Sequence, residues 1–133
     1  MIAYLKKDDW LKPVAGKVIG AIESGRLQGA VSSSSTFHEM YYVFSEHAPL
    51  ETILADFARV MTIKNLKFID AGTKTYLSAL HLAKTYGMKS IFDAIYAATA
   101  LSGSVPDHAL LSTDSVFDRV PGLRHVRPEE LRL

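Results

Sequence analysis

The sequence predicts an α/β domain, with a three-layer α/β/α arrangement around a short, mainly parallel sheet. Short apolar runs of strand length alternate with longer segments whose apolar residues recur with the helical period. Strands that are separated by helices usually pair in parallel. The composition also fits, since 48% of the 133 residues are hydrophobic, which supplies a core, and there is no cysteine for a disulfide scaffold. We expect a single domain over residues 1–133.

The first half of the chain is mostly helical. A helix that becomes regular near Lys12 carries one apolar stripe, and Gly25 follows as a natural stop. Thr36 and Glu39 have the spacing of a capping box in front of an apolar helix. Pro49 opens another helix, and the short link between these two helices predicts that they pack as a pair. The elements expected here are a helix at 9–24, a strand at 27–32, helices at 37–47 and 49–61, and a strand at 66–69.

The second half is organised around the helix expected at residues 90–101. This stretch is so rich in alanine and large apolar residues that both of its faces should be covered, as in an interior helix. Asp93, in its first turn, is then a carboxylate that needs a hydrogen-bond partner, a cation or water. The other elements expected are a helix at 73–86 with Tyr76, Leu77, Leu80, Ala83 and Tyr86 inward, strands at 109–112 and 124–126, and helical turns at 115–118 and 128–131.

Glu39, Asp93 and Asp114 all lie at strand-to-helix transitions or in first helical turns. In a parallel sheet these transitions line up along one edge, where ligand sites of α/β proteins form. Carboxylates that converge there repel one another unless they are protonated or bridged by a cation. Oxygen ligands without histidine or cysteine suit Mg²⁺ or Mn²⁺. The three acids are therefore candidate metal ligands.

Each acid also has a purely structural interpretation. Glu39 follows Thr36, and Asp93 follows Ser90, at capping-box spacing, while Asp114 is a natural N-cap or turn residue. The helix dipole favours carboxylates in a first turn as well. A cap and a metal ligand are compatible roles, so spacing leaves both open. The five histidines show no metal-ligand spacing, and the net charge of +1 indicates no class of partner.

The motifs resemble those of the PIN domain family, and most of all its VapC-type toxin ribonucleases. Residues 31–39 resemble the strand, polar turn and helix that carry the family's second acid. Residues 91–100 resemble its Asp-Ala-x-x-Ala-Ala-x-Ala helix, with Asp93 as the third acid. Residues 110–114 resemble its late strand and Thr-x-Asp motif, with Ser112 in place of the usual threonine. The resemblance covers nearly the whole chain.

The resemblance implies an endoribonuclease, the toxin of a toxin–antitoxin pair, that hydrolyses RNA phosphodiesters with Mg²⁺ or Mn²⁺. Glu39, Asp93 and Asp114 are the implied catalytic metal ligands, and Ser112 is implied to hold water or a ligand beside the metal. A homodimer, a small antitoxin partner and a cytoplasmic location are implied too. No membrane association is expected, because no apolar run approaches the length of a bilayer span. Apolar residues of the helical pair at 37–61, such as Tyr42, are the expected contacts with a second copy or the antitoxin.

The sequence departs from the family pattern at its start. The pattern begins with a strand that ends in an aspartate, and Ile2–Leu5 matches the apolar segment that follows this strand. We therefore expect the chain to lack the family's first strand and first acid. Either the natural chain starts further upstream, or the short chain closes its sheet by another route. The incomplete acid set predicts weakened Mg²⁺ binding, and it supports an alternative function as a degenerate PIN-like module that binds RNA or protein without cleaving.

Overall fold

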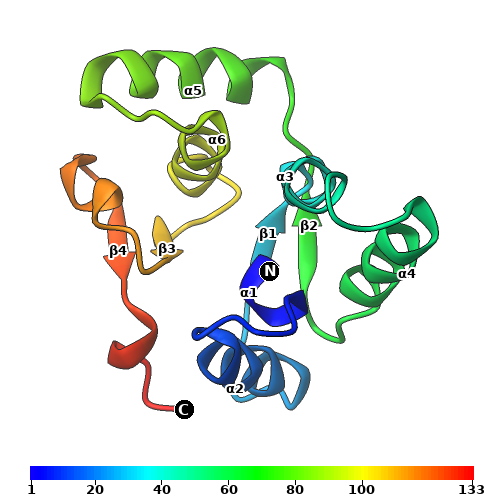
Figure 1. The fold of residues 1–133 in the computed structure, drawn as a ribbon. Coiled ribbons are helices and arrows are strands. Elements are labelled where there is room, and N and C mark those ends of the chain that lie inside the picture. Colours follow the sequence, from blue (N-terminus) through cyan, green and yellow to red (C-terminus); the bar gives the residue numbers. More distant parts are fainter. The chain divides into compact units, whose positions relative to one another are not determined.

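The computed structural model describes residues 1–133 and combines helices with short strands (Figure 1). The predicted α/β class with short parallel strands is confirmed. No helix has both the length and the apolar content that a membrane crossing requires. The elements in chain order are α1 (Ile2–Leu5), α2 (Lys12–Glu23), β1 (Val31–Ser33), α3 (Ser35–Phe44), α4 (Leu50–Met61), β2 (Lys67–Ile69), α5 (Thr73–Tyr86), α6 (Ile91–Ala100), β3 (Ala109–Leu111), the 3₁₀ helix η1 (Ser115–Arg119), β4 (Arg124–Val126) and the 3₁₀ helix η2 (Pro128–Glu130).

The strands form two separate two-stranded sheets, β1–β2 and β3–β4. β3 and β4 pair in parallel. Beside β1–β2, the N–H of Lys67 donates to the carbonyl of Ala30 at 3.2 Å. The N–H of Ser34 donates to the carbonyl of Ile69 at 2.8 Å. Because the residue numbers rise together on both strands, this pair is parallel as well.

The chain divides into two compact units, and it passes between them within the β1–β2 pair. Unit 1 comprises Met1–Ser32, Thr36–Lys67 and Leu133, and unit 2 comprises Ser33–Ser35 and Phe68–Arg132. α1, α2, α4 and most of α3 lie in unit 1, while α5, α6, β3, β4 and both 3₁₀ helices lie in unit 2. The three candidate acids are thus divided, one in unit 1 and two in unit 2.

Unit 1 is a group of helices joined by aromatic contacts. α2 ends just before Gly25, whose φ of 76° is the left-handed conformation that stops a helix. Phe37 of α3 packs at a tilt against Phe57 of α4, with 5.1 Å between the ring centroids, so these helices pack as the predicted pair. Arg59 of α4 lies over the ring of Tyr4, 4.6 Å from its centroid, and donates to its hydroxyl at 3.2 Å. This contact connects α1 to α4.

Unit 2 is built around α6, whose residues are mostly buried, as predicted for an interior helix. α5 packs against α6, and the residues that follow β3 complete the core. The buried cluster consists of Ala79, Met88, Ala94, Ile95, Ala97, Ala98, Phe117 and Val120. Most of the alanines in this cluster belong to α6, and their small side chains let the backbones of α5 and α6 approach closely.

The inward face predicted for α5 is partly wrong. Tyr76, Leu77 and Leu80 are exposed, at 43%, 72% and 61% respectively. Ala79 is fully buried instead, and Ala83 packs against the cluster as predicted. The helix carries two overlapping apolar stripes, and α6 covers the one that contains Ala79. Helical periodicity alone does not choose between such stripes.

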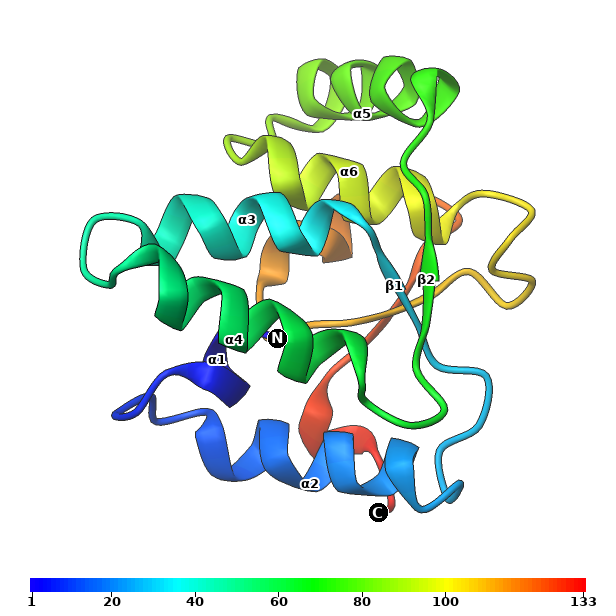
Figure 2. The ribbon, with the colours of Figure 1, turned by 90° about the vertical axis from the view of Figure 1, so that its right-hand side faces the viewer.

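The start of α6 and the end of β3 lie at the same end of unit 2. The chain turns back after α6, where Nδ1 of His108 lies 2.9 Å from the carbonyl oxygen of Ala100. β3 then packs against α6, so the two elements run in opposite directions (Figure 2). Side chains near the start of α6 and just beyond β3 are thereby brought to one end of the unit.

Candidate functional site

Asp93 lies in the first turn of α6 and is half-buried. Ser90 is the N-cap of this helix, and its Oγ accepts a hydrogen bond from the N–H of Asp93 at 3.4 Å. The carbonyl of Ser90 accepts the N–H of Ala94 at 3.2 Å. The predicted cap by Ser90 is therefore confirmed, and it fixes the backbone from which the Asp93 side chain projects.

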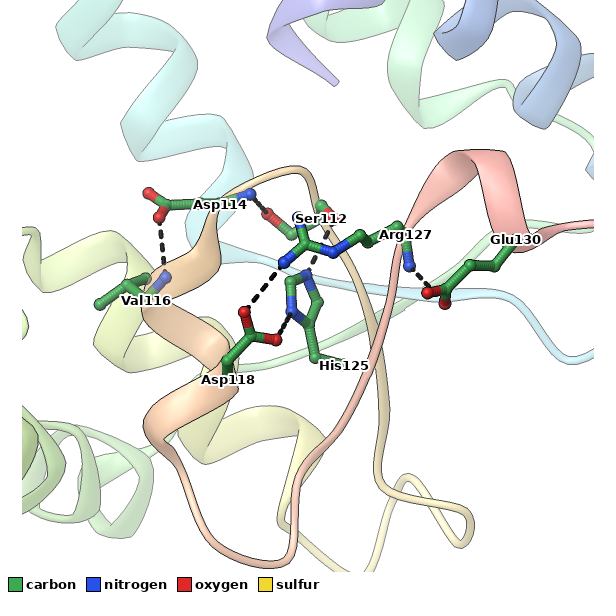
Figure 3. Close-up of polar contacts among 7 residues, drawn as sticks. All are labelled: Ser112, Asp114, Val116, Asp118, His125, Arg127 and Glu130. Atoms are coloured by element: carbon green, nitrogen blue, oxygen red, sulfur yellow. Dashed lines mark hydrogen bonds and ion pairs between the residues drawn. The ribbon is translucent and has the colours of Figure 1, made fainter.

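Asp114 is exposed and is the N-cap of η1, as predicted. Its Oδ1 accepts the N–H of Val116 at 2.9 Å, and its own N–H donates to Oγ of Ser112 at 3.1 Å (Figure 3). Its Oδ2 makes no hydrogen bond in the structure. The cap therefore leaves one carboxylate oxygen available to a cation.

Ser112 directly follows β3, and its backbone and its hydroxyl are both engaged. Its N–H donates to the carbonyl of Val126 at 3.1 Å, which extends the ladder between β3 and β4. Its carbonyl oxygen lies 2.9 Å from Nε2 of His125, and its Oγ accepts the N–H of Asp114. Ser112 therefore shapes the turn that carries Asp114.

Asp93 and Asp114 lie around the same end of unit 2. Asp93 is near the start of α6 and Asp114 is just beyond β3, which runs back along that helix. Phe117, in the 3₁₀ helix that Asp114 caps, belongs to the same buried cluster as Ala94, the neighbour of Asp93. The packing of Phe117 thus holds the Asp114 turn against α6.

Glu39 lies in α3, belongs to unit 1 and is half-buried. The capping box predicted for it with Thr36 is wrong. α3 begins at Ser35, whose N–H donates to Oγ of Ser33 at 3.2 Å, so Thr36 is inside the helix and Glu39 is beyond its first turn. Burial lowers the pKa of the α-amino group of Met1, and the negative charge of Glu39 opposes this shift. The charge of Glu39 therefore acts on the amino group of Met1.

A network of polar and charged side chains from η1, β4 and η2 adjoins the Asp114 turn (Figure 3). Nδ1 of His125 lies 2.7 Å from Oδ1 of Asp118, and Arg127 donates to Oδ2 of Asp118 at 2.9 Å. The N–H of Arg127 donates to Glu130 at 3.0 Å. The hydrogen bond from His125, aided by the charge of Arg127, holds the pKa of Asp118 below its ordinary value of 3.8. Asp118 is therefore ionised at neutral pH.

The donor chemistry of the three acids fits a divalent cation. Carboxylates without histidine or cysteine partners are the ligands that Mg²⁺ and Mn²⁺ prefer. Asp114 offers its Oδ2, and Asp93 offers a half-buried carboxylate at the same end of unit 2. The structure contains no group of three or more His, Cys, Asp or Glu side chains that could hold a metal ion. The ligand types therefore fit, and neither unit by itself supplies three such ligands in one cluster.

A family model described as the PIN domain matches residues 9–123. The chain belongs to the PIN domain family. The PIN match extends over both units and includes Glu39, Asp93 and Asp114. PIN domains are generally nucleases that use divalent metal ions, so the family supports a hydrolytic activity. The comparisons with curated proteins and with solved structures found no match.

The network of His125, Asp118 and Arg127 is not predicted by the sequence. The two partners of His125 are 7 and 13 residues away along the chain, in other elements, so no local spacing signals them. One weak signal is present, a histidine within a short strand that directly follows the Pro121-Gly122 turn. It indicates a polar residue on a strand but does not identify its partners.

Proposed function

We propose that this PIN domain is an Mg²⁺- or Mn²⁺-dependent endoribonuclease and the toxin of a toxin–antitoxin pair in the cytoplasm. The observation that carries the proposal is the PIN match over residues 9–123, which includes all three candidate acids. In this proposal both units act as one domain over residues 1–133, with Glu39, Asp93 and Asp114 as catalytic metal ligands. When bound, the cation would activate water and stabilise charge at an RNA phosphodiester.

The proposed site assigns a distinct task to each acid of unit 2. Asp114 would bind the cation through Oδ2 while its Oδ1 continues to cap η1. Asp93 would bind from the first turn of α6, where the positive end of the helix dipole favours a carboxylate. Ser112 would hold the Asp114 turn and, beside the metal, a water molecule. Glu39 would complete the set from α3.

The partner surface proposed is the apolar face of the α3–α4 pair. Large apolar side chains are exposed there, at 73% for Tyr42, 66% for Leu50 and 70% for Leu54. Leu50, Leu54 and Phe57 also line a groove between the two helices. Exposed apolar surface of this kind is typical of protein–protein contacts. We propose that a second copy of the chain or the antitoxin covers it.

Cleavage of a fluorogenic RNA by the full chain tests the proposal. We expect cleavage that requires Mg²⁺ or Mn²⁺, stops with EDTA, and falls at least a hundredfold in Glu39→Gln and in Asp93→Asn. Asp107→Asn is the matched control, because Asp107 is an exposed aspartate that precedes β3 and pairs with Arg124 at 2.6 Å. Cleavage that survives both acid variants would refute the proposed site.

The second candidate function is a degenerate PIN-like module that binds RNA or protein without cleaving it. The observation in its favour is that neither unit by itself assembles a group of three metal-binding side chains. This candidate predicts RNA binding without cleavage at any Mn²⁺ concentration. It also predicts that Asp93→Asn does not weaken RNA binding, since a carboxylate that holds no metal repels phosphate.

A further inference from the structure

The side chain of His125 is only 4% exposed, and both of its ring nitrogens are engaged. Nδ1 lies 2.7 Å from Oδ1 of Asp118, and Nε2 lies 2.9 Å from the carbonyl oxygen of Ser112. The ring also packs at a tilt against Phe117, with 5.8 Å between centroids. On β4, His125 is opposite Leu110 of β3. Its position is therefore fixed by strand pairing, by packing and by two polar contacts.

The partners of His125 determine which nitrogen donates. A carbonyl oxygen only accepts hydrogen bonds, so the contact with Ser112 requires a proton on Nε2. An ionised carboxylate also only accepts, so the contact with Asp118 is a hydrogen bond when Nδ1 carries a proton. Arg127 holds the other oxygen of Asp118 at 2.9 Å, which fixes the orientation of that carboxylate. The imidazole is thereby aimed at Ser112 (Figure 3).

The contact with Ser112 is the first link of a chain of hydrogen bonds that ends at the Asp114 carboxylate. His125 donates to the Ser112 carbonyl, Oγ of Ser112 accepts the N–H of Asp114, and Oδ1 of Asp114 accepts the N–H of Val116. No other hydrogen bond to the Ser112 carbonyl is found in the structure. The hydrogen bond from His125 is therefore the one that holds the Ser112 carbonyl in place.

We propose that His125 is a positioning residue for Asp114, which holds the Ser112–Asp114 turn through an Nε2–H hydrogen bond to the Ser112 carbonyl. The consequence for metal binding rests on the proposed function, in which Asp114 is a ligand. Groups that orient a ligand from outside the metal's contact distance typically change metal affinity by 10- to 100-fold when removed. Because His125 acts through a backbone carbonyl, we expect an effect at the lower end of this range.

Two amide substitutions of similar size separate the two nitrogens of the ring. In His125→Gln the side-chain N–H₂ reaches the position of Nε2, so it can still donate to the Ser112 carbonyl. In His125→Asn the N–H₂ lies near the position of Nδ1, so it can contact Asp118 but not Ser112. Both variants replace a buried ring by a smaller amide, and any general loss of packing is shared by the pair.

The experiment measures backbone amide exchange by NMR and Mn²⁺ affinity by calorimetry on the full chain. We expect His125→Asn to accelerate exchange at the amides of Asp114 and Val116 about tenfold and to weaken Mn²⁺ binding about tenfold. His125→Gln should stay within about threefold of wild type in both readouts. Amides inside α6 should be unchanged in both variants, which shows that unit 2 remains folded.

Equal behaviour of the two variants in the exchange readout, whether both match wild type or both lose protection, would overturn the proposal. Failure of the proposed function looks different. In that case wild type binds no Mn²⁺, but His125→Asn still accelerates exchange in the Asp114 turn and His125→Gln does not. This result would support the positioning role of His125 and contradict the proposed metal site.

Discussion

At the scale of single residues, Asp114 has two roles, as the N-cap of η1 and as a proposed metal ligand. Two substitutions distinguish these roles. Asp114→Asn keeps an oxygen for the N–H of Val116 but removes the charge, whereas Asp114→Ala removes both. We expect Asp114→Ala to lower the free energy of unfolding by about 1 kcal/mol and Asp114→Asn to stay within about 0.5 kcal/mol of wild type. Both should abolish Mn²⁺ binding. Urea denaturation and calorimetry measure the two effects.

Asp118 makes the stability of the chain depend on acid pH. Its pKa is lowered from 3.8 in the folded chain by the hydrogen bond from His125 and by Arg127. Because the pKa of Asp118 is lower in the folded chain than in the unfolded chain, its ionised form stabilises the fold at pH values above the unfolded-state pKa. This contribution is lost as the pH falls through the folded-state pKa. Wild type should therefore exceed Asp118→Asn in urea midpoint at pH 6, and the gap should close as the pH falls through the folded pKa, which lies below 3.8. A gap that is constant with pH would show that charge plays no part.

At the scale of elements, η1 holds the Asp114 turn against α6 through Phe117, which is 2% exposed. Phe117→Ala removes a ring from the core of unit 2 and should lower the free energy of unfolding by about 3–4 kcal/mol. Leu77→Ala is the matched control, because Leu77 is 72% exposed on α5 and should cost less than about 0.5 kcal/mol. Similar losses in the two variants, measured by urea denaturation, would contradict the burial of η1.

Most elements could be predicted from the sequence, because their limits are local. Gly25 and Ser90 mark the end of α2 and the start of α6 by their own backbone chemistry. The predicted start of α3 is two residues too late, because several residues of the serine run can begin a helix, and in the structure Oγ of Ser33 accepts the N–H of Ser35, the first residue of α3. The face of α5 was misassigned because Leu80 and Ala79 belong to competing apolar stripes. Tertiary packing decides such cases, and no local pattern encodes it.

The candidate site could be predicted in part for the same reason. Asp93 lies at the start of α6, and Asp114 lies just beyond β3, the next element in the chain. Because β3 returns along α6, the two residues come to the same end of unit 2. His125 could not be predicted, because its role depends on the register of β4 against β3. Register is set by pairing across the sheet rather than by the residues of one strand.

At the scale of the whole molecule, the exposed apolar face of α3–α4 predicts self-association. Leu54→Glu places a charge on this face and should convert a dimer to a monomer in size-exclusion chromatography with light scattering. Leu77→Glu is the matched control, since Leu77 is equally exposed but lies on α5. If Leu77→Glu dissociates the dimer and Leu54→Glu does not, the interface lies on α5 and the proposed surface is wrong.

The central proposal is that Glu39, Asp93 and Asp114 serve one metal site. The most direct test is a double-mutant cycle on RNA cleavage with Glu39→Gln, Asp114→Asn and the double variant. Residues that act as one unit have strongly non-additive effects. We predict that each single variant loses at least about a hundredfold in rate and that the double variant loses less than about tenfold more. Losses that multiply in the double variant, or cleavage that survives either substitution, would contradict a shared site.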